Sequence, residues 1–271
     1  MIIDGKKIAE SIISELKTRP RISKFFGAVA VGDDAVSLNF LKQKEKIAKE
    51  LNIDFRLYHF PANIKTDELR KEISRLAGVK NCGGFTVQLP LPPGINQQYA
   101  LNTIPKDKDV DILSETALGA FYSGRSNILP PAVSVVETII KEDKLDVKNA
   151  HAVVIGSGFL IGKPVSFWLQ NKVTALTVFD LQSQHLRAKL VEADLVVSGA
   201  GQANLFNSSE LKNGALVVDF GYSYSGEKIM ADFDPSGAEE KNIIYTPTPG
   251  GTGPILVAKL FENFYTLNSE K

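Results

Sequence analysis

Apolar residues in the first half of the chain recur with helical and strand-like periods in turn. Ile8, Ile12, Ile13 and Leu16 fall on one face of a helix that ends before Pro20. Beyond it, the pattern predicts strands at 25–31, 55–60 and 83–91 and helices at about 36–51 and 67–76. Strands that alternate with helices of this length favour crossover connections and a mostly parallel sheet, which is an α/β fold.

The segment between Pro92 and Pro131 breaks the pattern and predicts a connection between two domains. Prolines and Gly94 bound it, and regular spacing restarts after it. The second half of the chain predicts helices at about 133–141, 160–170 and 255–265 and strands at 152–155, 176–179, 195–198 and 216–220. We expect one domain at 1–130 and another at 131–254. The last helix, 255–271, could pack on either domain, and we favour the first.

Composition narrows the class of protein. Of 271 residues, 44% are apolar and 23% charged, as in folded soluble proteins. Thirty-one basic residues balance 31 acidic ones, so no net charge attracts nucleic acid or anionic lipid. The single cysteine, Cys82, excludes an intrachain disulfide framework and a zinc cluster of several thiolates. Without a signal sequence or an apolar run of about 18 residues, we expect a cytoplasmic protein with no membrane or nucleic-acid partner.

A glycine-rich turn follows the predicted strand 152–155. Gly156, Ser157, Gly158 and Gly162 lie between that strand and the next helix, where glycines let the backbone approach a pyrophosphate at a helix N-terminus. The next strand ends at Asp180, whose carboxylate could accept hydrogen bonds from the adenosine ribose and would repel a 2′-phosphate. These residues favour a Rossmann-like domain that binds NAD rather than NADP. A purely structural turn and a solvated loop aspartate are the alternatives.

Four motifs occur in order over essentially the whole chain. They are Gln88-Leu89-Pro90-Leu91-Pro92, Pro105-Lys106-Asp107-Lys108-Asp109-Val110-Asp111, the run 156–164 and the turn-rich stretch 247–254. Together they resemble the bifunctional methylenetetrahydrofolate dehydrogenase/methenyltetrahydrofolate cyclohydrolase family. The resemblance implies two α/β domains around a cleft, with folate on the first and NAD(P) on the second, and a homodimer. It implies oxidation of 5,10-methylenetetrahydrofolate and hydrolysis of the methenyl product to 10-formyltetrahydrofolate.

The resemblance also implies roles for residues in the folate half. Lys44 matches the catalytic lysine, Gln88 the glutamine that holds it, and Asp111 the aspartate that accepts two hydrogen bonds from the pterin. Phe40 lies one helical turn before Lys44 and would stack on the pterin. By residue type alone, a solvated lysine face at 42, 44 and 46 would be favoured. Aspartates 107, 109 and 111 would then be turn residues or a metal patch, but no complementary ligands accompany them and we expect no metal.

The remaining implied contacts involve both halves of the chain. The glycine loop before the last helix would let the backbone approach folate and nicotinamide closely, although a plain interdomain turn is the alternative. The additional folate contacts are Pro90, Gly251, Gly253 and Pro254, and the dinucleotide contacts are Gly156, Ser157, Gly158, Gly162, Asp180 and Tyr222.

Several residues depart from the family pattern. Phe40 replaces a tyrosine whose hydroxyl lies near the lysine, so a dehydrogenase without cyclohydrolase activity is one alternative. Ile112 replaces a glycine, and its branched side chain could fill space that the pterin uses or tilt Asp111. Further losses at Ala117, Leu129 and Leu256 leave a catalytically silent folate- or dinucleotide-binding protein as another alternative.

Two other points concern cofactor and substrate choice. Ser157 and Gly158 stand where Arg-Ser is typical, and 179–183 replaces a Cys-His-Ser-Lys-Thr type of segment. Both changes remove groups that would hold a 2′-phosphate, which favours NAD again. A dehydrogenase of similar form for a shikimate-type acid is a third alternative, but Gln88 and Asp111 are placed for a pterin rather than a carboxylate.

Overall fold

The computed structural model describes residues 1–180, 186–225 and 228–269, and its contacts divide the chain into two compact units. The N unit contains Glu10–Pro130 and the chain from Val257 onward, and the C unit contains Met1–Ala9 and Pro131–Leu256. The sequence placed residues 1–9 with the first domain. In the structure they belong to the C unit, because the N–H of Ile3 donates to the carbonyl of Tyr245 at 2.8 Å.

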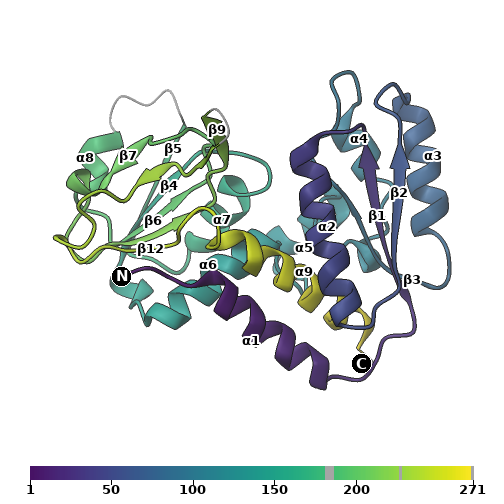
Figure 1. Cartoon of the computed structure of the whole chain (residues 1–271), viewed down its shortest axis with the longest axis horizontal. Helices are drawn as coiled ribbons and strands as arrows, with labels where there is room; N and C mark the ends of the chain where they lie inside the picture. Colours follow the sequence, from purple (N-terminus) through teal and green to yellow (C-terminus); the bar gives the residue numbers. More distant parts are fainter. Residues whose placement is uncertain (181–185, 226–227, 270–271) are drawn as a thin grey trace. The chain divides into compact units, whose positions relative to one another are not determined.

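The N unit is built on a parallel sheet of three strands. The strand order is β2 (Phe55–Phe60), β1 (Phe25–Val31), β3 (Cys82–Val87). Every residue of β1 and β3 is buried, as expected for a parallel sheet covered on both faces. The connecting helices α2 (Ala35–Glu50) and α3 (Thr66–Ala77) lie on opposite sides of the sheet in Figure 1. The predicted α/β class is confirmed.

The last helix supplies part of the core of the N unit. This helix, α9, spans Thr252–Asn268. The ring of Phe26 in β1 lies 5.3 Å, between centroids, from both Phe261 and Phe264 of α9. The first helix, α1 (Gly5–Thr18), likewise begins in the C unit and ends in the N unit. Segments from the two ends of the chain therefore help to complete the unit formed by its first half.

The segment predicted to be irregular contains short helices. These are α4 (Gln97–Leu101), α5 (Glu115–Tyr122) and the 3₁₀ turn η1 (Lys106–Lys108). Asn96 and Ser114 cap α4 and α5 by accepting a backbone N–H with their side chains, a signal that the spacing of apolar residues does not contain.

The C unit is built on a parallel sheet of five strands. In spatial order these are β12 (Ile244–Tyr245), β8 (Leu216–Asp219), β6 (Leu195–Ser198), β4 (His151–Ile155) and β5 (Ala175–Phe179). The chain runs from β4 to β5 on one side and returns to place β6 on the other side, so the strand order reverses between β4 and β6. Ligands of open α/β sheets bind outside the carboxyl ends of the strands at such a reversal.

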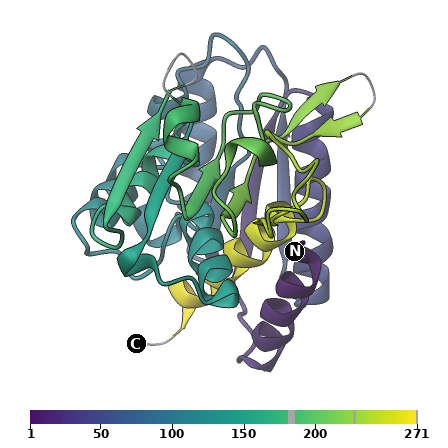
Figure 2. The same cartoon turned by 90° about the vertical axis from the view of Figure 1, so that its left-hand side faces the viewer.

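The other elements of the C unit are helices and short strand pairs. The helices are α6 (Pro131–Asp143), α7 (Gly162–Leu169) and α8 (Leu186–Leu190), with 3₁₀ turns η2 (Val147–Asn149) and η3 (Ser208–Glu210). The strand pairs are β7 (Phe206–Asn207) with β11 (Phe233–Asp234) and the antiparallel ribbon of β9 (Ser223–Ser225) with β10 (Lys228–Met230), which projects from the sheet in Figure 2. The strand pairs, η2, η3 and α8 span only two to five residues each, without a clear period, and the sequence did not predict them.

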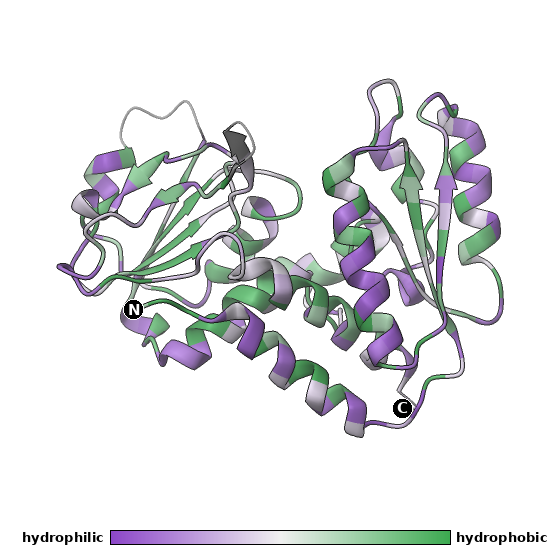
Figure 3. Cartoon of the chain, viewed as in Figure 1, coloured by the Kyte–Doolittle hydropathy of each residue, from purple (hydrophilic) through white to green (hydrophobic). Residues whose placement is uncertain are grey.

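Hydropathy follows burial in this fold. Figure 3 shows hydrophobic residues along β4, β6 and β8, and hydrophilic residues on the outer turns of α2 and α3. The side chains of β6 and β8 are all buried. Within the described residues, no helix combines the length and the apolar character needed to cross a membrane.

Candidate active site

Lys44 occupies the inner face of α2. The carboxylate of Asp34 accepts the N–H of Ser37 at 2.8 Å and fixes the start of this helix. Lys44 is only 9% exposed, whereas Lys42 and Lys46 are exposed. A solvated lysine face therefore describes the two neighbours but not Lys44.

Among the described residues, the amine of Lys44 makes one side-chain hydrogen bond. Its Nζ donates to Oε1 of Gln88 at 3.0 Å. Gln88 directly follows β3, and its Nε2 donates to the carbonyl of Leu89 at 2.9 Å, which directs Oε1 to the lysine. Burial lowers the pKa of Lys44 because it disfavours the charged amine, and the negative charge of Asp111 opposes this shift. The lysine thus has a neutral hydrogen-bond partner and an environment that favours its neutral form.

Asp111 is held by a residue that the sequence analysis missed. Thr86 is fully buried in β3, and its Oγ1 donates to Oδ2 of Asp111 at 2.6 Å. Thr86 lies two residues before Gln88, so strand alternation directs both side chains to one face of the sheet. A polar residue at this spacing within an apolar strand was the available signal. The structure brings Lys44, Gln88 and Asp111 together, with Thr86 as a fourth member.

Asp109 is a structural group rather than a ligand. It is fully buried, and its carboxylate accepts the N–H of Leu113 at 3.0 and 3.1 Å and that of Ser114 at 2.8 Å. Burial raises its pKa to about 6, while these hydrogen bonds oppose the shift. Asp107 is exposed, so the aspartates form no metal patch. Across residues 1–180, 186–225 and 228–269, no group of three or more acidic, His or Cys residues could hold a metal.

Ile112 adopts the left-handed conformation that suits a glycine. Its φ is 56°, in a region that β-branched residues rarely enter, and its side chain is 2% exposed. Asp111 nevertheless keeps its hydrogen bond to Thr86. Asn263 of α9 supports the same turn by donating from Nδ2 to the carbonyls of Val110 at 2.9 Å and Leu129 at 2.8 Å.

The other predicted folate contacts are divided between the two units. Phe40 is half-buried in α2, and Pro90 is exposed just after Gln88. Gly251 lies in the C unit, where a Cβ would collide with the carbonyl of Pro247. Gly253 and Pro254 form part of the first turn of α9, which begins three residues before the predicted start at 255, so they are helical rather than loop residues.

The glycine turn after β4 forms a bare backbone loop. Gly156 has a φ of 93°, and a Cβ on Gly162 would overlap the carbonyl oxygen of Gly156. The loop therefore closes tightly only with glycine at both positions. Ser157 and Gly158 are exposed, and a Cβ at Gly158 would have no atom within 4 Å. This arrangement leaves room for a phosphate group beside the backbone.

Two predicted dinucleotide contacts follow strands that lie on opposite sides of β4 in this sheet. Asp180 is exposed directly after β5, and Tyr222 is half-buried after β8. Residues 181–183, which the sequence analysis used to argue for NAD, lie outside the described residues. The other residues of that argument, Ser157, Gly158 and Asp180, are exposed.

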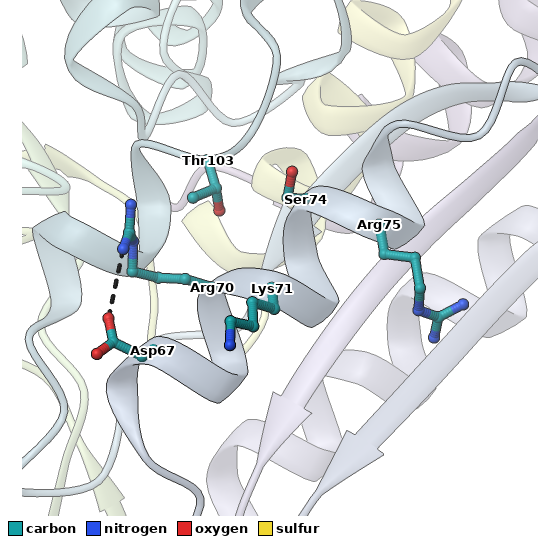
Figure 4. Close-up of a pocket in the computed structure, with 6 residues that line it drawn as sticks. All are labelled: Asp67, Arg70, Lys71, Ser74, Arg75 and Thr103. Carbon is teal, nitrogen blue, oxygen red and sulfur yellow. Dashed lines mark hydrogen bonds and ion pairs between the residues drawn. The ribbon is translucent and has the colours of Figure 1, made fainter.

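A groove of about 520 Å³ lies on α3 of the N unit, and none of the predicted site residues line it (Figure 4). Its residues are Asp67, Arg70, Lys71, Ser74, Arg75 and Thr103. Arg70 pairs with Asp67 at 3.4 Å, and Arg75 pairs with Glu72 at 2.5 Å. These ion pairs already use most of the positive charge of the groove.

The fold and the site define a class of enzyme. In the N unit, a buried lysine on α2 is bonded to Gln88 and lies near the negative charge of Asp111. In the C unit, a parallel sheet carries the glycine turn of dinucleotide-binding oxidoreductases. Residues 3–111 match the catalytic domain, and residues 130–271 the NAD(P)-binding domain, of tetrahydrofolate dehydrogenase/cyclohydrolase. The chain belongs to the tetrahydrofolate dehydrogenase/cyclohydrolase family.

Individual relatives agree with this assignment over their full lengths. The bifunctional protein FolD of Rickettsia bellii is 34% identical over 272 residues, covering 97% of this chain and 96% of its own. The crystal structure of bifunctional FolD from Campylobacter jejuni has a TM-score of 0.92 and 31% identity, with 99% and 98% of the two chains covered. The Trypanosoma brucei enzyme, complexed with NADP and an inhibitor, has a TM-score of 0.93 and 27% identity, with 98% and 96% covered.

Proposed function

We propose that the chain oxidises 5,10-methylenetetrahydrofolate with NAD(P)⁺ and hydrolyses the methenyl product to 10-formyltetrahydrofolate. The observation that carries the proposal is the buried Lys44 bonded to Gln88 in a chain whose two halves match the two domains of this family. The matched domains argue against a shikimate-type substrate. A homodimer and a cytoplasmic location remain predictions from the family resemblance and the composition.

Lys44 manages the protons of the hydrolytic step. In its neutral form, which burial favours, the amine accepts a proton from the water that attacks the methenyl carbon. The ammonium can then return a proton to the nitrogen that leaves this carbon, while the hydroxyl proton of the adduct passes to solvent. Gln88 keeps Nζ in place by accepting one of its hydrogen bonds.

Asp111 orients the pterin. Thr86 donates to Oδ2, so the carboxylate keeps acceptor capacity for the amino group and ring N–H of the pterin. Phe40, one turn from Lys44 on α2, offers a ring for stacking. Pro90 lies two residues after Gln88 in the sequence, and Gly251, Gly253 and Pro254 are further folate contacts predicted from the family resemblance.

The glycine turn of the C unit fits a dinucleotide. Gly158 is exposed between the buried Gly156 and Gly162 at the strand reversal. Ser157 and Tyr222 are further dinucleotide contacts predicted from the sequence. NAD(P)⁺, when bound, supplies the hydride acceptor for the first step. We assign Asp180 to the adenosine ribose and therefore propose a preference for NAD. Its test is kcat/KM with both cofactors, and an equal value or a preference for NADP would exclude it.

An absorbance assay tests the two activities separately. Methylenetetrahydrofolate is supplied with NAD or NADP, and the reduced cofactor and the methenyl product are followed at different wavelengths, with spontaneous hydrolysis subtracted. We expect reduced cofactor without accumulation of the methenyl compound. Accumulation would instead indicate a dehydrogenase alone, the outcome that the missing hydroxyl at Phe40 would explain. No turnover by folded protein would favour a silent binding protein.

A further inference from the structure

Two carboxylates without a role in the proposed reaction are buried in the C unit. Asp219 is the last residue of β8, and Asp232 directly precedes β11. Both are fully buried. Two buried acidic groups destabilise a fold unless hydrogen bonds satisfy them, so their partners indicate why they are kept.

Asp232 gathers the loop that follows β6. Its Oδ2 accepts the hydroxyl of Ser198 at 2.6 Å and the N–H of Ala200 at 2.8 Å. Its Oδ1 accepts the N–H of Gln202 at 2.8 Å. Three donors from five consecutive residues converge on one side chain, which fixes the path of the loop.

Asp219 fixes the loop that follows β8. Its Oδ1 accepts the N–H of Gly221 at 2.6 Å, and its Oδ2 accepts that of Phe233 at 2.8 Å. The Phe233 bond joins β8 to the segment that carries Asp232. A Cβ on Gly221 would overlap Oδ1 of Asp232, so the second carboxylate lies directly against the loop held by the first.

The backbone of Asp219 extends the network to a third loop. Its carbonyl accepts the hydroxyl of Thr252 at 2.9 Å, and its N–H donates to the hydroxyl of Thr246 at 2.8 Å. Thr252 follows Gly251 in the glycine-rich stretch that the sequence assigns to folate and nicotinamide.

These loops adjoin the dinucleotide turn. A Cβ on Gly156 would lie 3.0 Å from the carbonyl oxygen of Gly199, between Ser198 and Ala200, so the loop held by Asp232 forms one wall of the turn. Asp180 marks the adenosine side at β5. Because β6 and β8 lie on the other side of β4, their loops fall on the nicotinamide side.

We propose that Asp219 and Asp232 form a positioning pair, which sets the loops on the nicotinamide side of the dinucleotide site without contacting the reacting atoms. The inference rests on the proposed function for the identity of the ligand. Burial and the nearby charge of Asp232 raise the pKa of Asp219 to about 7, so the pair holds a second negative charge only as the pH rises through that value. Asp232 is the charged side chain facing Asp219, and the hydroxyls of Ser198, Thr246 and Thr252 are the neutral polar groups around the pair.

The test compares Asp219→Asn and Asp232→Asn with the control Asp234→Asn. An amide places an N–H group where a carboxylate oxygen accepts, so each variant of the pair leaves a backbone donor unsatisfied. Asp234 lies two residues after Asp232, and among the described residues its carboxylate accepts hydrogen bonds from the local residue Ser236. Dissociation constants for NAD and NADP are measured by calorimetry, which does not require turnover. Hydrolysis of methenyltetrahydrofolate, which needs no dinucleotide, reports on the N unit.

We expect the dissociation constant of the better cofactor to rise roughly 10- to 100-fold in both variants of the pair, with hydrolysis and the control unchanged. We also expect the affinity of the wild type for this cofactor to fall as the pH rises through about 7. Asp219→Asn should not show this pH-dependent fall for the same cofactor. Unchanged affinity, an identical pH profile, or a parallel loss of hydrolysis would overturn the proposal. If an amide variant does not fold, Ser198→Ala removes one donor to Asp232 and should weaken binding in the same direction.

Discussion

Both units bury ionisable side chains, but these side chains differ in the hydrogen bonds that they make. In the N unit, Lys44 has one side-chain partner, Gln88, among the described residues and a lowered pKa. In the C unit, the carboxylates of Asp219 and Asp232 together accept hydrogen bonds from one side-chain and four backbone donors. Burial alone therefore does not identify a catalytic group.

The number of hydrogen bonds that a buried group makes distinguishes a catalytic group from a structural one. An ammonium has three donors, and Lys44 leaves capacity for a water or a substrate. The carboxylates of the C unit are bound on both oxygens, which suits a fixed scaffold. The N unit contains the same contrast between two aspartates. Asp109 accepts hydrogen bonds from several backbone N–H groups, whereas Asp111, two residues later, accepts one from the hydroxyl of Thr86.

The largest effect is expected from removing the amine of Lys44. Lys44→Met keeps the length of the side chain but cannot transfer protons, so hydrolysis of methenyltetrahydrofolate should fall by about 10² to 10⁴-fold. In the wild type the rate should rise with pH as the amine loses its proton, at a lower pH than for an ordinary lysine because burial lowers its pKa. The exposed Lys42→Met is the matched control. A variant at Lys44 with wild-type hydrolysis and pH dependence would exclude the proposed role.

Removal of the buried carboxylate of Asp109 should reduce stability rather than activity. Asp109→Ala leaves the N–H groups of Leu113 and Ser114 without their acceptor and should reduce the free energy of unfolding by about 1–3 kcal/mol, whereas the exposed Asp107→Ala should have little effect. Denaturant titration measures both variants. Equal stability of the two variants would show that the buried hydrogen bonds contribute nothing net.

The raised pKa of Asp109 also predicts a pH dependence. Folding shifts this pKa from 3.8 to about 6, so the folded state binds more protons in that window. The stability contributed by the group is complete below about pH 4 and is lost as the pH rises through about 6. Asp109→Asn should flatten this part of the stability profile, and an unchanged profile would contradict the assignment.

An intermediate effect on folate binding is expected from removing the hydroxyl of Thr86, which donates to Asp111. Thr86→Val keeps the shape of the side chain and removes the hydroxyl donor, which should raise KM for the folate by up to about 10-fold, equivalent to about 1.4 kcal/mol. The dissociation constant for dinucleotide is the internal control, because Thr86 belongs to the N unit. A rise in both constants would indicate a general loss of structure instead.

The sequence predicted the regular elements better than their connections. Strands 25–31, 55–60 and 195–198 have their predicted bounds because each is an uninterrupted apolar or alternating run. Helices α4 and α5 were missed because their signal is a capping side chain, and α9 begins earlier than predicted because Gly253 and Pro254 are tolerated in a first helical turn.

The site was predictable where a local motif carried it. Lys44, Gln88 and Asp111 came from motifs that resemble a family, and the structure brings these three together. Thr86 could be inferred only from strand alternation. Asn263 reaches Val110 across 153 positions in the sequence, and Asp219 reaches Phe233 across 14, so no local pattern could indicate their roles.

The smallest expected effect lies at Phe40. Phe40→Tyr would place a hydroxyl one helical turn from Lys44, where a further hydrogen bond could stabilise the amine and speed hydrolysis by a few-fold, on the order of 1 kcal/mol or less. The dehydrogenase rate should not change, because hydride transfer depends on alignment rather than on this proton. A gain confined to hydrolysis would mean that the phenylalanine limits the second activity. No gain would mean that burial and Gln88 already suffice to prepare Lys44. The contrast between this lysine, with one side-chain partner among the described residues, and the enclosed carboxylates would then account for its reactivity without a second partner.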